Sequence, residues 1–347
     1  MRGKGINFDT GFLSVGTTTR EPFDPDVVRQ EMRVISDDLH CTAVRITGGD
    51  PDRLEITARH AADAGLEVWF CPFTNGLTQD ALLELLADCA ERAERLRRSG
   101  AEVIFLTGSE VSLFTIGFFP GDTLEERLAL IKDPVRVRTV IGEVRARMKH
   151  FLRRVVEVVR ARFRGRVSYA SLPFEGIDWT LFDIIATDAA YRTKQNAAQY
   201  RESIRAFVAQ GRSLGKPVAI TEFGCGAFRG AADAAGRDPT FSIIVWGDDG
   251  RAAKLNDECQ RDEDEQATYL RELIEVFETE GVDSAFVYTF ARYDLLHRDE
   301  PEMDIDRVSA GVVKVLDGHT GARHGRYRDM PWEPKAAFRT LADCYQR

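Results

Sequence analysis

The regular alternation of strand-like and helix-like segments constrains this chain most. Eight short, nearly continuous apolar runs each precede a helical or turn segment, and no break resembling a linker interrupts the series. Strands that are apolar on both faces and separated by helices are typical of a parallel sheet covered on its outer side. The eight expected strands span residues 5–9, 42–48, 67–73, 102–110, 167–172, 184–191, 217–224 and 284–291.

A count of eight predicts a single closed (β/α)8 barrel over residues 1–347. A minimal barrel needs only about 250 residues, and the surplus falls in long loops after strands 4, 7 and 8. Length alone would also allow two domains. A doubly wound open sheet is the alternative architecture, although no glycine-rich phosphate loop follows the first strand.

Charge and composition narrow the classes of partner. The chain has 56 acidic and 47 basic residues and a formal net charge of -9, whereas nucleic-acid binding needs clustered Lys and Arg. No apolar run approaches the roughly 18 residues of a membrane span, and the N-terminus lacks the apolar core of a signal peptide. The six dispersed cysteines include no CxxC pair, which favours reduced thiols and a cytoplasmic location. We expect no nucleic-acid or membrane partner, and the oligomeric state stays open.

Polar side chains gather at the expected carboxyl ends of the strands, where barrel active sites lie. Carboxylates and aromatic rings dominate there, which favours acid–base chemistry on an uncharged polar substrate such as a sugar. No HxH or HExxH pattern occurs, so neither a metal nor another cofactor is expected. The candidates for substrate binding are Asn7, Asp9, Arg45, Asn75, Ser109, Glu175, Asp188, Tyr191, Tyr288, Phe290 and Arg292.

Glu110 and Glu222 form the sharpest pair of candidate catalytic residues. Each ends an apolar strand beside small residues such as Gly108 and Gly224, which we expect to leave room for a ligand. Strands 4 and 7 lie across the barrel mouth from each other, so the two carboxylates can flank one bond. Retaining glycosidases need two carboxyl groups about 5 Å apart, one as acid/base and one as nucleophile.

Two other interpretations of these glutamates stay open. In the first, each one pairs with an arginine such as Arg45 or Arg292 and only holds the mouth together. In the second, Glu175 replaces Glu110 as the partner of Glu222.

The motifs around the pair resemble clan A of the glycoside hydrolases. The resemblance is carried by Gly-Ser-Glu110 at strand 4, Thr-Glu222-Phe-Gly at strand 7 and an aromatic strand 8. It implies a (β/α)8 retaining enzyme with Glu110 as acid/base and Glu222 as nucleophile. Arg45 and Tyr191 match the clan's arginine and tyrosine, which implies that they orient the nucleophile.

Two positions depart from the clan pattern. The clan usually has Asn before the acid/base, in contact with the sugar 2-hydroxyl, where this chain has Ser109. Strand 8 commonly carries a Trp platform, for which Tyr288 and Phe290 are the candidates here. Both departures concern the sugar-binding subsite. The chain also loosely resembles actinobacterial proteins labelled abortive infection proteins.

The sequence therefore predicts a retaining glycosidase that hydrolyses a small glycoside. Two alternatives are a catalytically idle barrel that binds a carbohydrate or a protein partner, as in phage defence, and a lyase or isomerase. Aromatic side chains near strand ends and on loops either stack on a sugar or aglycone or pack within the loops. They are Trp69, Phe73, Phe114, Phe118, Phe119, Trp179 and Trp246.

Overall fold

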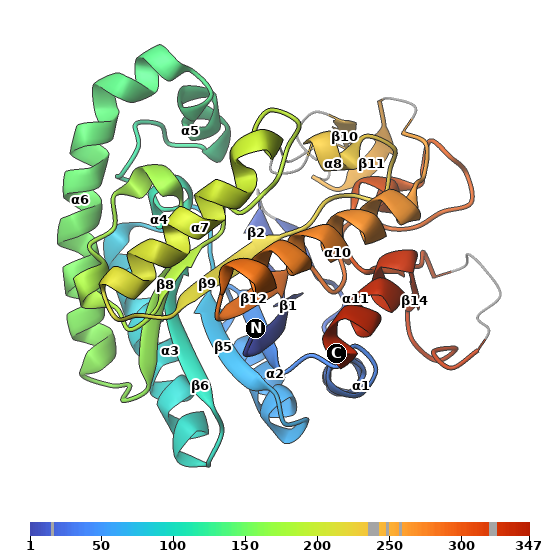
Figure 1. Cartoon of the computed structure of the whole chain (residues 1–347), viewed down its shortest axis with the longest axis horizontal. Coiled ribbons are helices and arrows are strands. Elements are labelled where there is room, and N and C mark those ends of the chain that lie inside the picture. Colours follow the sequence, from blue (N-terminus) through green and yellow to red (C-terminus); the bar gives the residue numbers. More distant parts are fainter. Residues whose placement is uncertain (15–16, 235–242, 248–249, 257–258, 319–324) are drawn as a thin grey trace.

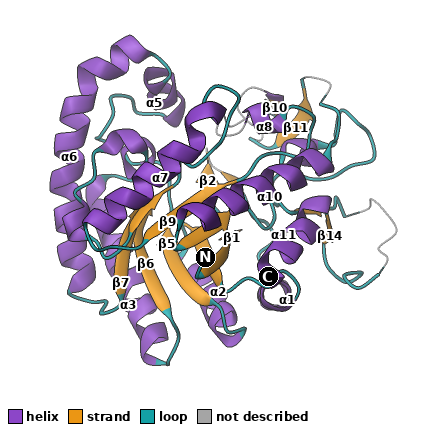
Figure 2. Cartoon of the chain, in the orientation of Figure 1, coloured by secondary structure: helices purple, strands orange, loops and turns teal. Residues whose placement is uncertain are grey.

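Eight parallel strands form the centre of the computed structural model, which describes residues 1–14, 17–234, 243–247, 250–256, 259–318 and 325–347. Their order is β7-β6-β5-β4-β1-β12-β9-β8, and a parallel bridge between Ser171 and Thr187 joins the two ends. The sheet thus closes into the predicted (β/α)8 barrel, with its helices outside the strands (Figure 2). The strands are β1 (Gly3–Asp9), β4 (Ala43–Gly48), β5 (Glu67–Pro72), β6 (Val103–Ser109), β7 (Arg166–Ala170), β8 (Ile185–Thr187), β9 (Val218–Phe223) and β12 (Ser284–Val287).

Long helices connect the strands and cover the barrel (Figure 1). Asp24 and Asp50 accept backbone N–H groups at the starts of the first two, and a proline occupies the first turn of each. Two short 3-10 turns, η1 (Pro173–Glu175) and η2 (Trp179–Leu181), connect β7 to β8. The long helices are α1 (Pro25–Asp37), α2 (Pro51–Asp63), α3 (Gln79–Arg98), α6 (Pro134–Arg160), α7 (Ala197–Ser213), α10 (Glu263–Glu280) and α11 (Ala336–Gln346).

The surplus length lies in the loops after β6, β9 and β12, as expected, and these loops contain short elements of their own. The loop after β6 holds α4 (Val111–Phe114) and α5 (Leu124–Ile131). A hairpin of β2 (Leu13–Ser14) and β3 (Thr17–Thr18) follows β1, which the sequence did not indicate. The remaining elements are α8 (Ala231–Ala234), β10 (Ile244–Trp246) and β11 (Ala252–Leu255) after β9, and η3 (Ile305–Val308), β13 (Val313–Val315) and β14 (Trp332–Pro334) after β12.

Several strands are shorter than their apolar runs. The eighth strand was expected over 284–291 but ends at Val287, and the sixth was expected over 184–191 but covers only Ile185–Thr187. The apolar residues beyond β12 are buried under the loops. Phe290, for example, is fully buried and packs on Phe8 and Trp332. Packing in the loops and pairing in the sheet produce the same apolar pattern, so the pattern overestimates strand length.

No helix in the described ranges is long and apolar enough to cross a lipid bilayer. All six cysteine side chains are buried.

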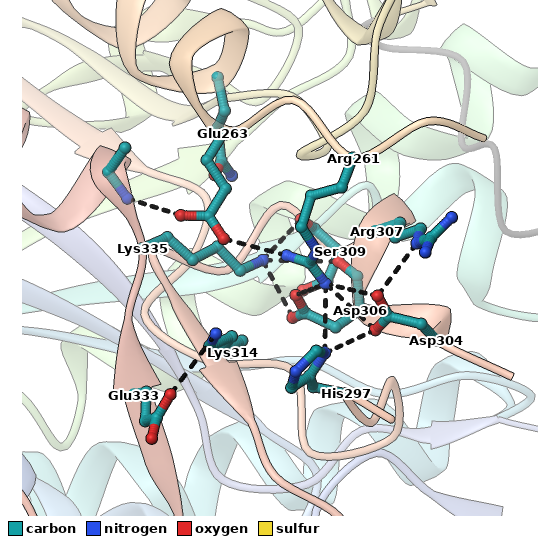
Figure 3. Close-up of polar contacts among 12 residues, drawn as sticks. Arg261, Glu263, His297, Asp304, Asp306, Arg307, Ser309, Lys314, Glu333 and Lys335 are labelled. Carbon is teal, nitrogen blue, oxygen red and sulfur yellow. Dashed lines mark hydrogen bonds and ion pairs between the residues drawn. The ribbon is translucent and has the colours of Figure 1, made fainter. Parts of the chain in front are cut away.

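A buried ionic network ties the loop after β12 to the start of α11 (Figure 3). Arg261 Nη2 lies 2.9 Å from Asp304 Oδ2 and 3.0 Å from Asp306 Oδ2. Lys335 Nζ reaches Asp306 Oδ1 at 2.9 Å, and His297 Nδ1 lies 2.8 Å from Asp304 Oδ1. The Asp306 and Lys335 side chains are at most 1% exposed. Charges buried this deeply depend on one another, because each would be costly to bury alone.

Replacing Arg261 by Met is therefore expected to lower the free energy of unfolding by about 3 kcal/mol, measured by denaturant titration. Burial alone would raise the pKa of Asp304, but hydrogen bonds with His297 and Arg261 hold it well below its ordinary value. A lowered carboxyl pKa stabilises the fold at neutral pH, and this contribution is lost only as the pH falls through the folded-state pKa. The matched control is Arg29→Met, since Arg29 pairs with Asp26 at the surface. An equal loss in both variants would contradict a stabilising role for the network.

Candidate active site

Arg45 occupies the centre of the barrel mouth and joins four strands. It lies on β4, is fully buried, and its Nη1 lies 2.8 Å from Glu222 Oε1 on β9. The same nitrogen lies 3.1 Å from Asn7 Oδ1 on β1 and 3.1 Å from Asp188 Oδ1 just past β8. Asn7 in turn donates from Nδ2 to the Thr221 carbonyl at 2.9 Å. One guanidinium thus fixes the relative positions of two carboxylates and an amide.

Glu222 is held by two donors at the end of β9. Its Oε1 accepts from Arg45, and its Oε2 accepts from the Tyr191 hydroxyl at 3.2 Å. Burial and the negative charge of Asp188 raise the pKa of Glu222 to about 7, while Arg45 and Tyr191 act in the opposite direction. Donors on both carboxylate oxygens favour the ionised form.

Glu110 has a different environment on the other side of the mouth. It was expected within strand 4, but the strand ends at Ser109 because Glu110 adopts a left-handed backbone with φ of 47°. Such a conformation is uncommon for a residue with a side chain, and strained backbone of this kind recurs at functional sites. Within the described part of the chain, no hydrogen bond reaches its carboxyl group.

The pKa values of the two glutamates are also shifted by different neighbours. Burial, followed by the negative charges of Asp188 and Glu222, raises the pKa of Glu110 well above its ordinary value. Glu110 lacks the pair of donors that Glu222 has, so its surroundings favour the protonated form more strongly than those of Glu222 do. Two carboxyl groups whose environments separate their protonation states are the arrangement that acid–base catalysis uses.

Asp188 connects the halves of the site. Ser109 Oγ donates to its Oδ2 at 2.5 Å, and Arg45 contacts both of its oxygens, at 3.1 Å and 3.3 Å. Ser109 and Asp188 are 2% and 1% exposed. The serine proton is therefore directed at Asp188 inside the barrel and away from the mouth.

A second polar group lies at the ends of β1 and β12. Asp9 accepts from the Gly11 N–H at 2.9 Å and from the Thr19 hydroxyl. Arg292 makes two hydrogen bonds to Asp294, at 2.9 Å and 2.7 Å, and donates to the Tyr288 hydroxyl at 3.2 Å. Burial raises the pKa of Asp9, and the hydrogen bonds from Thr19 and Gly11 oppose this effect. The charge of Asp294 also raises this pKa, whereas the charge of Arg292 lowers it. These residues thus form a cluster beside the carboxylate pair.

Three other predicted residues are held by contacts within the protein. Glu175 is fully buried and accepts from the Tyr169 hydroxyl and the Leu172 N–H, both at 2.8 Å, and burial raises its pKa to about 7. Asn75 Oδ1 lies 3.4 Å from Arg127 Nη2, and Phe290 lies in the core described above. Their role in substrate binding remains a prediction from strand position.

The small residues beside the glutamates allow neighbouring parts of the chain to pack closely against them. A Cβ on Gly224 would lie 2.4 Å from the Tyr288 carbonyl oxygen, and one on Gly108 would lie 2.7 Å from Val111 Cγ2. We expected these glycines to leave room for a ligand. Instead, the space beside each glycine is occupied by other parts of the chain, which approach it closely.

A cleft of about 1510 Å³ opens beside the cluster of Asp9 and Arg292. Its walls come from the loops after β1, β6, β9 and β12 and from the start of α1. It borders the cluster around Asp9 at Thr19 and Asp294, which contact Asp9 and Arg292. The sequence did not indicate this cleft, because its lining residues come from segments far apart in the chain. They include Thr18, Thr19, Glu21, Asp24, Glu125, Trp246, Arg251, Tyr293, Asp294, Arg298, Met303, Ile305 and Leu316.

The exposure of the aromatic candidates distinguishes stacking from packing. Trp69, Phe118, Phe119 and Trp179 are buried, whereas Trp246 is 42% exposed and lines the cleft. In the ranges that the structure describes, no group of three or more His, Cys, Asp or Glu side chains is placed to hold a metal ion.

Comparisons with known proteins find the same fold in solved structures. No family model and no curated protein matches the sequence. A GH113 β-1,4-mannanase aligns over 99% of this chain and 98% of its own, with a TM-score of 0.62 and 16% identity. The GH113 β-mannanase AaManA of Alicyclobacillus acidocaldarius, in complex with ManMIm, aligns over 99% and 97%, with a TM-score of 0.56 and 15% identity. Thermotoga maritima Cel5A, in complex with mannotriose, aligns over 88% and 96%, with a TM-score of 0.52 and 12% identity.

At these identities the similarity concerns architecture. The chain folds as a (β/α)8 barrel of the kind that glycoside hydrolases use.

Proposed function

We propose that this barrel is a retaining glycoside hydrolase in which Glu110 is the acid/base and Glu222 is the nucleophile. The observation that carries the proposal is the contrast between the two carboxyl groups. Glu222 accepts hydrogen bonds from Arg45 and Tyr191, while Glu110 lies near three other carboxylates without such donors. This contrast matches the needs of a nucleophile that is ionised and an acid that holds a proton.

The first step breaks the glycosidic bond. Glu110 transfers its proton to the glycosidic oxygen, which leaves with the bonding electron pair as the aglycone alcohol. A carboxylate oxygen of Glu222 forms a bond to the anomeric carbon, giving a glycosyl ester. Arg45 and Tyr191 aim this carboxylate.

The second step reverses the roles. Glu110, now ionised, takes a proton from water, and the water oxygen bonds to the anomeric carbon while the ester bond to Glu222 breaks. Two inversions at one carbon give net retention of configuration, and the enzyme returns to its starting protonation state.

Trapping the glycosyl ester tests the proposal. Activated aryl 2-deoxy-2-fluoro glycosides form the ester but hydrolyse it slowly, because fluorine destabilises the cationic transition state. We expect a mass adduct on the peptide that contains Glu222 and, with ordinary aryl glycosides, a product of retained anomeric configuration by NMR. An inverted product, or an adduct on another residue, would refute the assignment.

Replacing Asp188 by Asn should shift the pH dependence of kcat/KM. The Asp188 charge raises the pKa of both Glu222 and Glu110, so its removal lowers both values. The acidic limb, set by Glu222 with a pKa of about 7, and the alkaline limb, set by Glu110, are both expected to move to lower pH. Asp183→Asn is the matched control, because Asp183 pairs with Arg160 at the opposite end of β8. Limbs that stay in place in Asp188→Asn would show that Asp188 does not tune the pair.

A further inference from the structure

We infer that Tyr169 is a positioning residue for the candidate acid/base, because its hydroxyl binds the backbone of the turn that Glu110 begins. The inference rests on the proposed function and deepens it. It gives a role to Tyr169 and Glu175, two fully buried residues that the two-step mechanism does not use. In this role Tyr169 contacts no substrate atom and acts through the backbone that carries Glu110.

The two N–H groups that follow Glu110 are bound by side chains from the next strand and its loop. The Val111 N–H donates to the Tyr169 hydroxyl at 2.9 Å. The Ser112 N–H donates to Glu175 Oε1 at 3.2 Å. Tyr169 lies on β7 and Glu175 lies in η1, and both hydrogen bonds are buried. The first turn of α4 is therefore held by a neighbouring segment of the chain.

Glu175 fixes the direction of the Tyr169 hydroxyl. The hydroxyl donates its proton to Glu175 Oε1 at 2.8 Å, which leaves its oxygen to accept from Val111. Burial and the neighbouring Glu175 raise the pKa of Tyr169 well above its ordinary value, so the hydroxyl keeps its proton. Glu175 is held in turn, since its Oε2 accepts from the Leu172 N–H at 2.8 Å.

The same segment fixes the start of the turn. The Glu110 N–H donates to the Ala170 carbonyl at 3.0 Å, where the pairing of β6 with β7 is irregular. The stretch from Tyr169 to Glu175 thus binds three consecutive N–H groups, beginning with that of Glu110. A movement of this stretch would displace the base of the Glu110 side chain directly.

Glu110 occupies the position from which a side chain ordinarily caps a helix. A residue there commonly has an extended backbone, and its side-chain oxygen accepts from one of the first N–H groups of the helix. Glu110 instead has a left-handed backbone, with φ of 47° and ψ of 38°, and among the described residues its carboxyl makes no capping bond. Tyr169 and Glu175 cap the turn in its place.

This substitution of one cap for another preserves the acid. Every N–H group that donates to a carboxylate favours the ionised form. Burial and the negative charges of neighbouring carboxylates, Asp188 first among them, raise the pKa of Glu110, and a capping bond would oppose that effect. By binding the Val111 N–H, Tyr169 keeps a competing donor away from the group that must hold a proton.

Tyr169→Phe tests the inference, since it removes the hydroxyl and keeps the ring that packs on Phe182. The buried Val111 N–H then lacks its acceptor, and we expect the adjacent Glu110 carboxyl to turn toward it. One new N–H bond should lower the pKa of Glu110 by about one unit. Carboxyl 13C NMR of protein labelled at the glutamate Cδ measures this pKa, and the Glu110 signal is the one that Glu110→Gln lacks.

The kinetic effect should fall on protonation of the leaving group. Above its pKa, a fall of one unit leaves about a tenth of the acid protonated, so kcat/KM for aryl glycosides with poor leaving groups should fall about tenfold in Tyr169→Phe. Dinitrophenyl glycosides, whose leaving group needs no proton, should lose far less. A smaller fraction of folded protein would lower both rates alike.

Tyr345→Phe is the matched control. The Tyr345 hydroxyl is also buried and donates to the Gly5 carbonyl at 3.0 Å, on β1, which lies across the ring of strands from β7. Its loss should leave the titration of Glu110 and the dependence on leaving group unchanged. Glu175→Gln keeps a side-chain oxygen for both donors, so it should retain the turn.

The outcomes separate the inference from the proposed function. An unchanged pKa of Glu110 in Tyr169→Phe, with aryl glycosides still hydrolysed, would overturn the inference and leave the glycosidase proposal standing. A lowered pKa in that variant would support the inference even if the wild-type protein hydrolysed no aryl glycoside, a result that refutes the proposed function alone.

Hydrogen exchange of the wild-type protein keeps the test independent of how well the variant folds. The Val111 and Ser112 amides should be protected, because both donate to buried acceptors. Rapid exchange of these two amides in the folded protein would overturn the inference.

Discussion

Glu222→Gly is expected to lower kcat/KM for an aryl glycoside by roughly 10⁴-fold or more, as the removal of a covalent nucleophile does. Without the carboxylate no glycosyl ester forms, and the space it vacates, between Arg45 and Tyr191, accepts a small anion. External azide should restore turnover, since azide attacks the anomeric carbon directly from the side that Glu222 occupied. The product is then a glycosyl azide of inverted configuration, which NMR identifies.

Wild-type protein with azide is the control for this experiment, and its product should keep the configuration of the substrate. Unchanged turnover of every aryl glycoside in Glu222→Gly would remove Glu222 from the mechanism. In that case the contact of Arg45 with Glu222 would be a structural ion pair.

Glu110→Gln is expected to lower kcat/KM by about 10²–10⁴-fold for substrates with poor leaving groups. A dinitrophenolate departs without a proton, so the first step on dinitrophenyl glycosides should be slowed far less. The alkaline limb of the pH profile should also disappear, because the group that loses its proton there is gone. Steady-state rates across a series of aryl leaving groups measure the first effect.

Glu175→Gln provides a matched control for Glu110→Gln. Burial raises the pKa of Glu175 as well, but its oxygens accept from Tyr169 and Leu172 within the fold. Its substitution should affect stability and leave the dependence on leaving group unaltered. A steeper dependence in Glu175→Gln than in Glu110→Gln would instead support the pairing of Glu175 with Glu222.

The architecture could be predicted from the sequence because strand and helix periodicities are local. Each of the eight apolar runs overlaps an observed strand, and closure of the sheet agrees with their number. The ends of the runs were less accurate. Glu110 leaves its strand through a left-handed turn, and Phe290 continues an apolar pattern into the core under the loops. Neither backbone conformation nor loop packing leaves a distinct local signal.

Part of the candidate site could likewise be predicted from the sequence, and part could not. Arg45, Asp188, Tyr191 and Glu222 could be named together because strand ends converge at the barrel mouth, and the structure places them in contact. The direction of the Ser109 hydroxyl depends on Asp188, which is distant in sequence. The cleft depends on loops that are far apart in the chain, and it could not be predicted before their paths were known.

The ionic network of Figure 3 has a consequence for how the cleft meets its ligand. Ile305 lines the cleft between Asp304 and Asp306, and Arg261 holds both of these neighbours. The conformational entropy of this wall is therefore lost during folding, before any ligand arrives. A wall that is already ordered loses little entropy when a complex forms, so more of the contact energy is left for discrimination between ligands.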